Sequence, residues 1–357
     1  MKNRIIYFDY LRVMAMISVV LLHVSGQNWG AFNGRSLTWN ILNFYDAIVR
    51  WGVPVFIMIS GSLFLSNEAD IKKIYQKNIF RLLVVYFSWS IVYAFIIPIV
   101  KAVLLESYVI SFKEILYNTV GGEYQYHMWF LPMIIGLYIC VPLIGEIVKS
   151  PKATVYFLVL SFVFTFLIPQ AVNISNDFVG GMFAEIVNKI NTVIFKNMNV
   201  QLVFGYSFYF VLGYLMNNTE LSKAHRFIIY GLGAVGFLST ILLNAVIAWK
   251  TDVPCATYYS NYSINVMLET VAIYTWFKYR RYENEVLNKL VFALSKYSLG
   301  VYLVHVFILF LLDSFEINSF TLSPFVSVPL ISAIAIIVSF FVSWLLAKVP
   351  IINKWMI

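Results

Sequence analysis

The chain alternates between long apolar runs and short polar segments. The apolar runs fall at roughly 6–26, 42–65, 82–104, 127–148, 153–173, 200–217, 227–249, 262–278, 290–314 and 325–347. A helix of about 20 residues crosses a hydrocarbon core of about 30 Å, and each run reaches or approaches that length. The pattern predicts an all-α, polytopic membrane helix bundle of about ten transmembrane helices, with residues 1–357 forming a single transmembrane domain.

Composition supports a membrane protein over a soluble one. Of the 357 residues, 61% are hydrophobic and 12% are charged, whereas soluble domains carry about 25% charged residues. Because this number of charges cannot cover a water-exposed surface, we expect the protein to be embedded in the lipid bilayer. The net charge of +8 lies in short patches between apolar runs, which is typical of membrane topology and not of a nucleic-acid-binding face.

The first apolar run is not expected to be a cleaved signal peptide. It contains Asp9, Arg12 and His23, and no small-residue cleavage site follows. The two cysteines, Cys140 and Cys255, have no metal-ligand spacing, so we expect no metal. Oligomeric state stays open.

The basic residues orient the bundle. With a cytoplasmic N-terminus and ten spans, the inner segments hold Lys2, Arg4, Lys72, Lys73, Lys77, Arg81, Lys149, Lys152, Lys223, Arg226, Lys278, Arg280, Arg281, Lys289, Lys348 and Lys354. The outer segments hold fewer: Arg35, Lys101, Lys113, Lys189, Lys196 and Lys250. Because cytoplasmic loops carry the excess of Lys and Arg, both termini are predicted to be cytoplasmic. No internal repeat is visible, which disfavours inverted-repeat transporter folds.

Arg12 and His23 are the strongest candidate pair because ionisable residues inside a span are costly. Eleven residues make three helical turns and about 20°, so both side chains share one face, about 16 Å apart along the axis. In one interpretation Arg12 binds an anion and His23 accepts a proton. In the other, Arg12 pairs with Asp9 at the inner interface and His23 belongs to an outer aromatic belt.

The sequence around this pair resembles the acyltransferase-3 family of membrane acyltransferases. The family's first helix carries an Arg and a His separated by ten residues, as in Phe8-Asp9-Tyr10-Leu11-Arg12 and Leu21-Leu22-His23. Further landmarks follow in the family's order along nearly the whole chain: Val53-Pro54-Val55-Phe56, Ile59-Ser60-Gly61, the basic loop Lys72 to Arg81, His127-Met128-Trp129-Phe130-Leu131, Phe210-Val211-Leu212-Gly213-Tyr214 and Ser298-Leu299-Gly300-Val301-Tyr302-Leu303-Val304-His305. The sequence is most similar to the stand-alone branch that modifies surface polysaccharides.

The resemblance implies transfer of an acyl group, usually acetyl, from cytoplasmic acyl-CoA to a hydroxyl of an extracytoplasmic or lipid-linked glycan at the cell membrane. Longer family members add a C-terminal extracytoplasmic domain of the esterase type, which has no counterpart here. An acyl relay through such a domain would therefore need a partner protein. Direct transfer and an acyl-histidine intermediate both stay open.

The candidate site residues follow from this chemistry. His23, Arg12 and His127 are the expected catalytic residues, with His23 as general base. Arg12, Arg81 and Lys77 are expected to hold the phosphates of acyl-CoA. The loop lysines are also explained by topology alone, and His127 by an interfacial anchor beside aromatic residues.

Other polar residues in the spans have structural explanations. A functional role for His305 and a buried histidine hydrogen-bonded to a neighbouring helix explain this residue equally well. Ser60 and Gly61 are expected to allow close helix packing. Asp46 and Arg50 are four residues apart and are expected to pair. Glu269 is expected to hydrogen-bond to another helix.

Two rivals from other classes stay open. A polysaccharide transporter or flippase also uses buried charges along a path, and loss of His23 would then reduce the exported polymer. A membrane scaffold in a glycan-synthesis complex would tolerate Arg12→Ala and His23→Ala provided that it still inserts.

Overall fold

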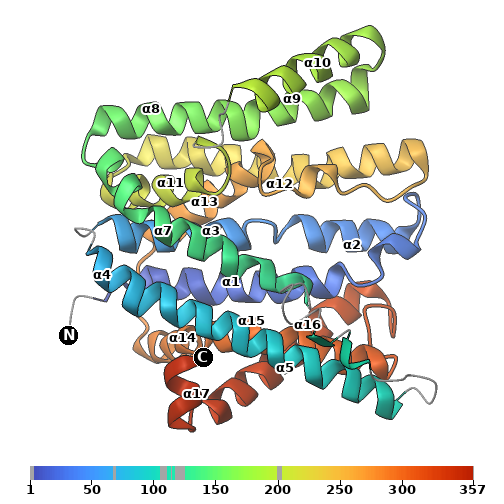
Figure 1. Ribbon diagram of the computed structural model, residues 1–357. Helices are drawn as coiled ribbons and strands as arrows, with labels where there is room; N and C mark the ends of the chain where they lie inside the picture. The colour runs from blue at the N-terminus through green and yellow to red at the C-terminus, as the bar shows by residue number, and fades with distance from the viewer. Residues whose placement is uncertain are drawn as a thin grey trace.

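The fold is helical throughout the part of the chain that the structure describes (Figure 1). This structure is a computed structural model, and it describes residues 4–66, 70–104, 111–113, 115–116, 125–198 and 203–356. The all-α membrane bundle predicted from the sequence is confirmed. Most of the outer loop expected at 105–126, and Lys2, lie outside the described residues.

The elements follow one another along the chain with short connections. In order, they are α1 (Ile6–Ser25), α2 (Leu37–Ala47), α3 (Gly52–Leu65), α4 (Ile71–Lys73), the π-helical segment Ile74–Ile79, α5 (Phe80–Leu104), the 3-10 turn Tyr126–Trp129, α7 (Phe130–Val148), α8 (Pro151–Phe162), α9 (Ile168–Ile174), α10 (Gly181–Asn197), α11 (Ser207–Asn218), α12 (Lys223–Thr251), the 3-10 turn Thr257–Tyr259, α13 (Ile264–Tyr279), α14 (Glu285–Lys296), α15 (Ser298–Ser314), α16 (Pro324–Leu346) and α17 (Pro350–Trp355).

Side-chain caps explain several helix starts. The hydroxyl of Ser36 accepts a hydrogen bond from the backbone N–H of Trp39 at 3.1 Å. Ser150 accepts one from the N–H of Ala153 at 3.3 Å, and Pro151 occupies the first helical position. Because the first N–H groups of a helix have no intrahelical partner, these caps mark where each helix begins.

Each of the ten apolar runs contains a helix, but not all of these helices are long. Among the described residues, seven helical stretches are long and apolar enough to cross a membrane, or eight if α14 and α15 count as one span bent by 65°. Helices α11 and α13 have 12 and 16 residues, short of the usual span length. The count of ten and the cytoplasmic termini stay predictions.

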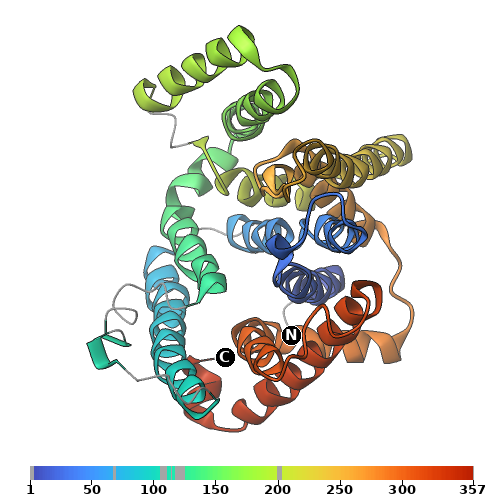
Figure 2. The same ribbon diagram turned by 90° about the vertical axis from the view of Figure 1, so that its right-hand side faces the viewer.

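Helix α1 lies inside the bundle. It packs against α2, α3, α14, α15 and α16, and the end-on view shows it between the α2–α3 pair and the α15–α16 pair (Figure 2). Arg12 and His23 are therefore carried by a helix with protein on most sides, where a polar side chain faces other helices instead of lipid.

Small residues bring α3 and α11 into close contact. A Cβ atom at Gly61 would collide with the backbone carbonyl of Phe210, and one at Gly213 with the backbone of Met58. Ser62 contributes a hydroxyl that bonds to the carbonyl of Gly213 at 2.8 Å. The packing role expected for Gly61 is confirmed, and this contact fixes the position of one wall of the site.

Helices α8, α9 and α10 lie at the edge of the bundle, where α10 runs back along α9 (Figures 1 and 2). Helix α17 packs on α5 at the other side of the molecule. The indole N–H of Trp89 donates to the carbonyl of Met356 at 2.9 Å, which attaches the end of the chain to α5.

Candidate functional site

A cavity of about 490 Å³ opens between α1, α3, α5, α7 and α15. Its volume suits a small-molecule site. The polar and aromatic side chains of its walls are Arg12, His23, Arg50, Phe56, Ser60, Phe64, Arg81, His127, Trp129, Phe130, Tyr138, Asn261, Ser298 and Tyr302. The structure therefore brings four of the five predicted site residues, Arg12, His23, His127 and Arg81, to one cavity.

Three histidines from three different helical elements gather at one end of this cavity. The rings of His23 and His305 stack with centroids 5.2 Å apart and an interplanar angle of 25°. The rings of His127 and His305 meet edge to face at 5.4 Å. His127 is 1% exposed and His305 is 0% exposed. His305 lies behind the other two, because it does not reach the cavity wall.

The hydrogen bonds of His305 assign its tautomer. Its Nδ1 atom lies 2.7 Å from the carbonyl of Tyr302 and 3.1 Å from that of Val301, so Nδ1 carries the hydrogen. The prediction that His305 bonds to a neighbouring helix is wrong, because both carbonyls belong to its own helix α15. The ring tilts back along its helix because a residue's side chain reaches the carbonyls three and four positions earlier.

Unpartnered nitrogens distinguish this end of the cavity. Within the described ranges, Nε2 of His305 and both ring nitrogens of His127 are buried without a hydrogen-bond partner. Native proteins leave few buried polar atoms unpaired, and those that remain commonly serve a site. The geometry suits a polar substrate that enters the cavity and completes the hydrogen bonds of His127.

Tyrosines hold the histidines in place. Tyr126 packs on His23 with ring centroids 5.0 Å apart, and Tyr93 packs on His127 at 5.5 Å. The hydroxyl of Tyr302 donates to the backbone carbonyl of His127. This bond connects α15 to the turn before α7, so the three histidines form one packed unit.

Arg12 marks the other end of the cavity. Its Nη1 lies 3.5 Å from Oδ1 of Asp9, which is the pairing of the structural interpretation of Arg12. Asp9 is also bound by Nε of Arg4 at 2.5 Å and by the hydroxyl of Ser295 at 2.8 Å. The Arg12 side chain is 32% exposed and lines the cavity. Because Asp9 is shared with Arg4 and Ser295, and only Nη1 of Arg12 contacts it, the other N–H groups of Arg12 can bind a substrate anion.

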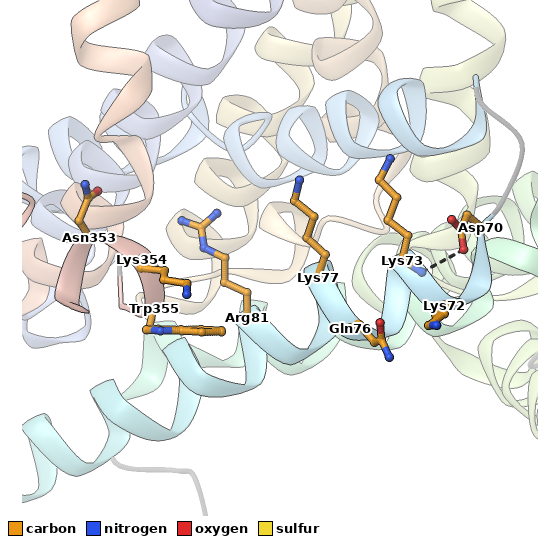
Figure 3. A pocket seen from close by; sticks show the side chains of 9 residues that line it. All are labelled: Asp70, Lys72, Lys73, Gln76, Lys77, Arg81, Asn353, Lys354 and Trp355. Carbon is orange, nitrogen blue, oxygen red and sulfur yellow. Dashed lines mark hydrogen bonds between the residues drawn. The ribbon is translucent and has the colours of Figure 1, made fainter. Parts of the chain in front are cut away.

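A second, basic pocket of about 700 Å³ adjoins this end. It is lined by Asp70, Lys72, Lys73, Gln76, Lys77, Arg81, Asn353, Lys354 and Trp355 (Figure 3). Lys73, Lys77 and Arg81 project from the same side of the helix (Figure 3), since residues four apart share a face. Lys77 therefore lies in this pocket and not in the cavity, and Arg81 lines both.

Two intramembrane charges behave as the sequence predicted. Arg50 forms an ion pair with Asp46, and its guanidinium also lies over the ring of Tyr259 at 4.2 Å. Glu269 accepts a hydrogen bond from Thr240 on the adjacent α12. Both expected pairings are confirmed, and Arg50 in addition lines the cavity.

Several residues of the site were not predicted from the sequence. Trp129 lies within the family motif His127-Met128-Trp129-Phe130-Leu131, but no pattern singled it out. Asn261 lies in a polar turn with no distinguishing pattern. Trp355 and Lys354 reach the basic pocket from α17, although they follow Lys77 by 278 and 277 residues in the sequence. Only the tertiary packing identifies these residues.

Comparison with known proteins gives one match. A family model described as an acyltransferase domain, that of the acyltransferase-3 family, matches residues 5–348. Neither the curated proteins nor the solved structures contain a match to this chain. The family match covers the histidine cluster, Arg12 and Arg81, and ends just before α17. The chain belongs to the acyltransferase-3 family and is a membrane acyltransferase.

Proposed function

We propose that this membrane acyltransferase transfers an acyl group, acetyl in the simplest case, from cytoplasmic acyl-CoA to a hydroxyl of an extracytoplasmic or lipid-linked glycan at the cell membrane. The observation that carries the proposal is one cavity with Arg12 and Arg81 at one end and His23 and His127 at the other. Transfer of an acyl group needs both an anion site for the donor and a base for the acceptor.

The basic pocket suits the nucleotide part of acyl-CoA. Lys72, Lys73, Lys77 and Lys354 supply the charge that phosphates require. The half-buried indole of Trp355 presents an aromatic face on which adenine can stack. Arg81 belongs to both pockets, so a donor bound by its phosphates can extend its pantetheine arm past Arg12 into the cavity.

The histidine end suits the reaction. A glycan hydroxyl is a poor nucleophile at neutral pH, and a positioned base assists its attack. The hydroxyl oxygen bonds to the thioester carbon, the hydroxyl proton moves to His23, and the carbon–sulfur bond breaks. The CoA thiolate then takes up one proton, and the products are a glycan ester and CoA. His127, with both nitrogens unpartnered, is placed to orient the acceptor or the thioester carbonyl.

The test uses cells from which the gene is deleted. Such cells carry the wild-type protein, His23→Ala or no protein, with equal membrane abundance of the first two. We expect ester-linked acyl groups on the surface glycan with the wild-type protein only, and equal polymer yield in all three.

Two results would contradict the proposal. An unchanged ester content without the protein excludes glycan acylation. A fall in polymer yield with His23→Ala indicates a polysaccharide transporter.

A further inference from the structure

A run of aromatic rings leads from the edge of the bundle to the histidine end of the cavity. Phe195, on α10, contacts Phe204 with ring centroids 5.5 Å apart, and Phe204 contacts Tyr262 at 5.5 Å. Tyr262 contacts Tyr206 at 4.9 Å, and Tyr206 stacks on Trp129 at 5.7 Å with an interplanar angle of 26°. These five rings come from four separate segments of the chain.

Local structure fixes this aromatic run. Gly205 has φ +96°, a conformation that favours glycine, and its turn places Tyr206 directly before α11. The amide of Asn261 donates to the hydroxyl of Tyr206 at 2.9 Å, and the hydroxyl of Tyr209 donates to the carbonyl of Asn261 at 2.7 Å. The rings are therefore held before any ligand binds.

The inner end of the run belongs to the cavity itself. Trp129 and Asn261 line the cavity together with His23 and His127. Trp129 follows His127 by two residues in the same 3-10 turn, and the residue is 42% exposed. The carboxamide oxygen of Asn261 forms no hydrogen bond to the described residues, so it can accept one from a ligand hydroxyl.

The chemistry of these groups fits a sugar. The face of a pyranose ring presents C–H groups, which pack on the flat face of an indole or phenol ring. The hydroxyls at its edge need polar partners, which Asn261 and His127 offer. None of the five aromatic side chains or Asn261 carries a charge, so the surface fits an uncharged residue of the glycan.

We propose that Trp129, Tyr206, Tyr262 and Asn261 form the acceptor subsite, which holds an uncharged pyranose residue of the glycan beside His23. This inference rests on the proposed glycan acylation. The competing explanation is an aromatic belt that anchors the protein at the membrane interface. A belt does not require that Trp129 and Asn261 line the catalytic cavity.

The experiment measures acyl transfer in proteoliposomes. The donor is radiolabelled acetyl-CoA, and the acceptor is surface polysaccharide purified from cells that lack the protein. The variants are Trp129→Ala, the conservative Trp129→Phe, and Trp249→Ala. Trp249 is a matched control because it is an exposed tryptophan at the end of α12 and does not line the cavity.

For Trp129→Ala we expect the KM for polysaccharide to rise about tenfold, with the KM for acetyl-CoA unchanged. Trp129→Phe should recover most of the loss, and Trp249→Ala should match the wild-type protein. Equal polysaccharide KM values in Trp129→Ala and wild type would overturn the subsite while acylation stands. Similar losses in both alanine variants would indicate an interfacial belt. If the wild-type protein labels no polysaccharide, the proposed function fails and the subsite fails with it.

Discussion

The two ends of the cavity differ in how their polar groups are satisfied. At the arginine end, Arg12 is partly exposed and paired with Asp9, and the lysines of the adjoining pocket are exposed. At the histidine end, His127 and His305 are buried and keep nitrogens without partners. Charges at the first end stay near water, where they can exchange one anion for another. The second end keeps its imidazoles buried, and His127 lines the cavity where a substrate group can reach it.

In the proposed function, this difference separates binding of the donor from the chemistry of transfer. An exposed cationic site can capture the phosphates of acyl-CoA at little desolvation cost. A buried site limits the water that would hydrolyse the thioester, and strengthens each hydrogen bond made there. Variants of the histidines should therefore change kcat, whereas variants at the arginine end should change the KM for acyl-CoA.

The largest effect is expected for His23→Ala. Removing a general base lowers the rate by about 10²- to 10⁴-fold, while the KM for acyl-CoA should change little. The measurement is steady-state acyl transfer in proteoliposomes. His225→Ala is the matched control, since His225 lies in the first turn of α12 outside both pockets. Full activity of His23→Ala would remove the histidine end from the chemistry.

Arg12→Ala should act on the donor. Loss of charge-assisted hydrogen bonds to phosphate raises the KM for acyl-CoA by about 10- to 100-fold. Arg12→Lys should recover only part of the affinity, because an ammonium group cannot form a bidentate contact. A change confined to the KM for polysaccharide would reverse the assignment of the two ends.

His305→Phe tests whether the stacked histidine positions His23. The substitution keeps an aromatic ring but removes the hydrogen bonds of Nδ1. We expect kcat to fall about tenfold through misplacement of His23, with both KM values unchanged. The pH–rate profile is the second readout, and its acidic limb should shift because the neighbouring imidazole is gone. A profile identical to that of the wild-type protein, at reduced protein abundance, would indicate a purely structural role.

Lys77→Ala should have the smallest effect. A single exposed lysine contributes about 0.2–1 kcal/mol to an ionic contact, so the KM for acyl-CoA should rise less than about fivefold. High salt should abolish the difference by screening. Lys149→Ala is the control, because Lys149 pairs with Glu146 away from the basic pocket. An effect that persists at high salt would place Lys77 in direct, desolvated contact with the donor.

The sequence correctly predicted a helix within each apolar run and one shared helix face, but the number of spans stays a prediction. Apolar runs mark helices because the bilayer offers no partner for backbone groups, and the eleven-residue spacing of Arg12 and His23 places both in one cavity. Helix ends were predicted less well. The run at 200–217 contains a helix that begins only at Ser207, after the turn at Gly205. Hydropathy also cannot detect the bend between α14 and α15, because apolar residues occur on both sides of it.

The remainder of the site depends on tertiary packing. His305 reaches His23 only because α15 packs on α1, and no local pattern encodes that contact. The sequence predicts that Lys77 binds the donor, but it does not show that Lys77 shares a pocket with residues of α17. Trp355 could not be found from the sequence, since one aromatic residue near a chain end resembles an interfacial anchor.

The central claim is that the donor enters at the arginine end and the acyl group leaves at the histidine end, on opposite sides of the membrane. The most direct test compares inside-out and right-side-out vesicles from cells that make the protein and its glycan. Membrane-impermeant radiolabelled acetyl-CoA is added outside each. The account predicts labelled glycan inside the inside-out vesicles and none in right-side-out vesicles. Labelling in right-side-out vesicles alone would contradict it.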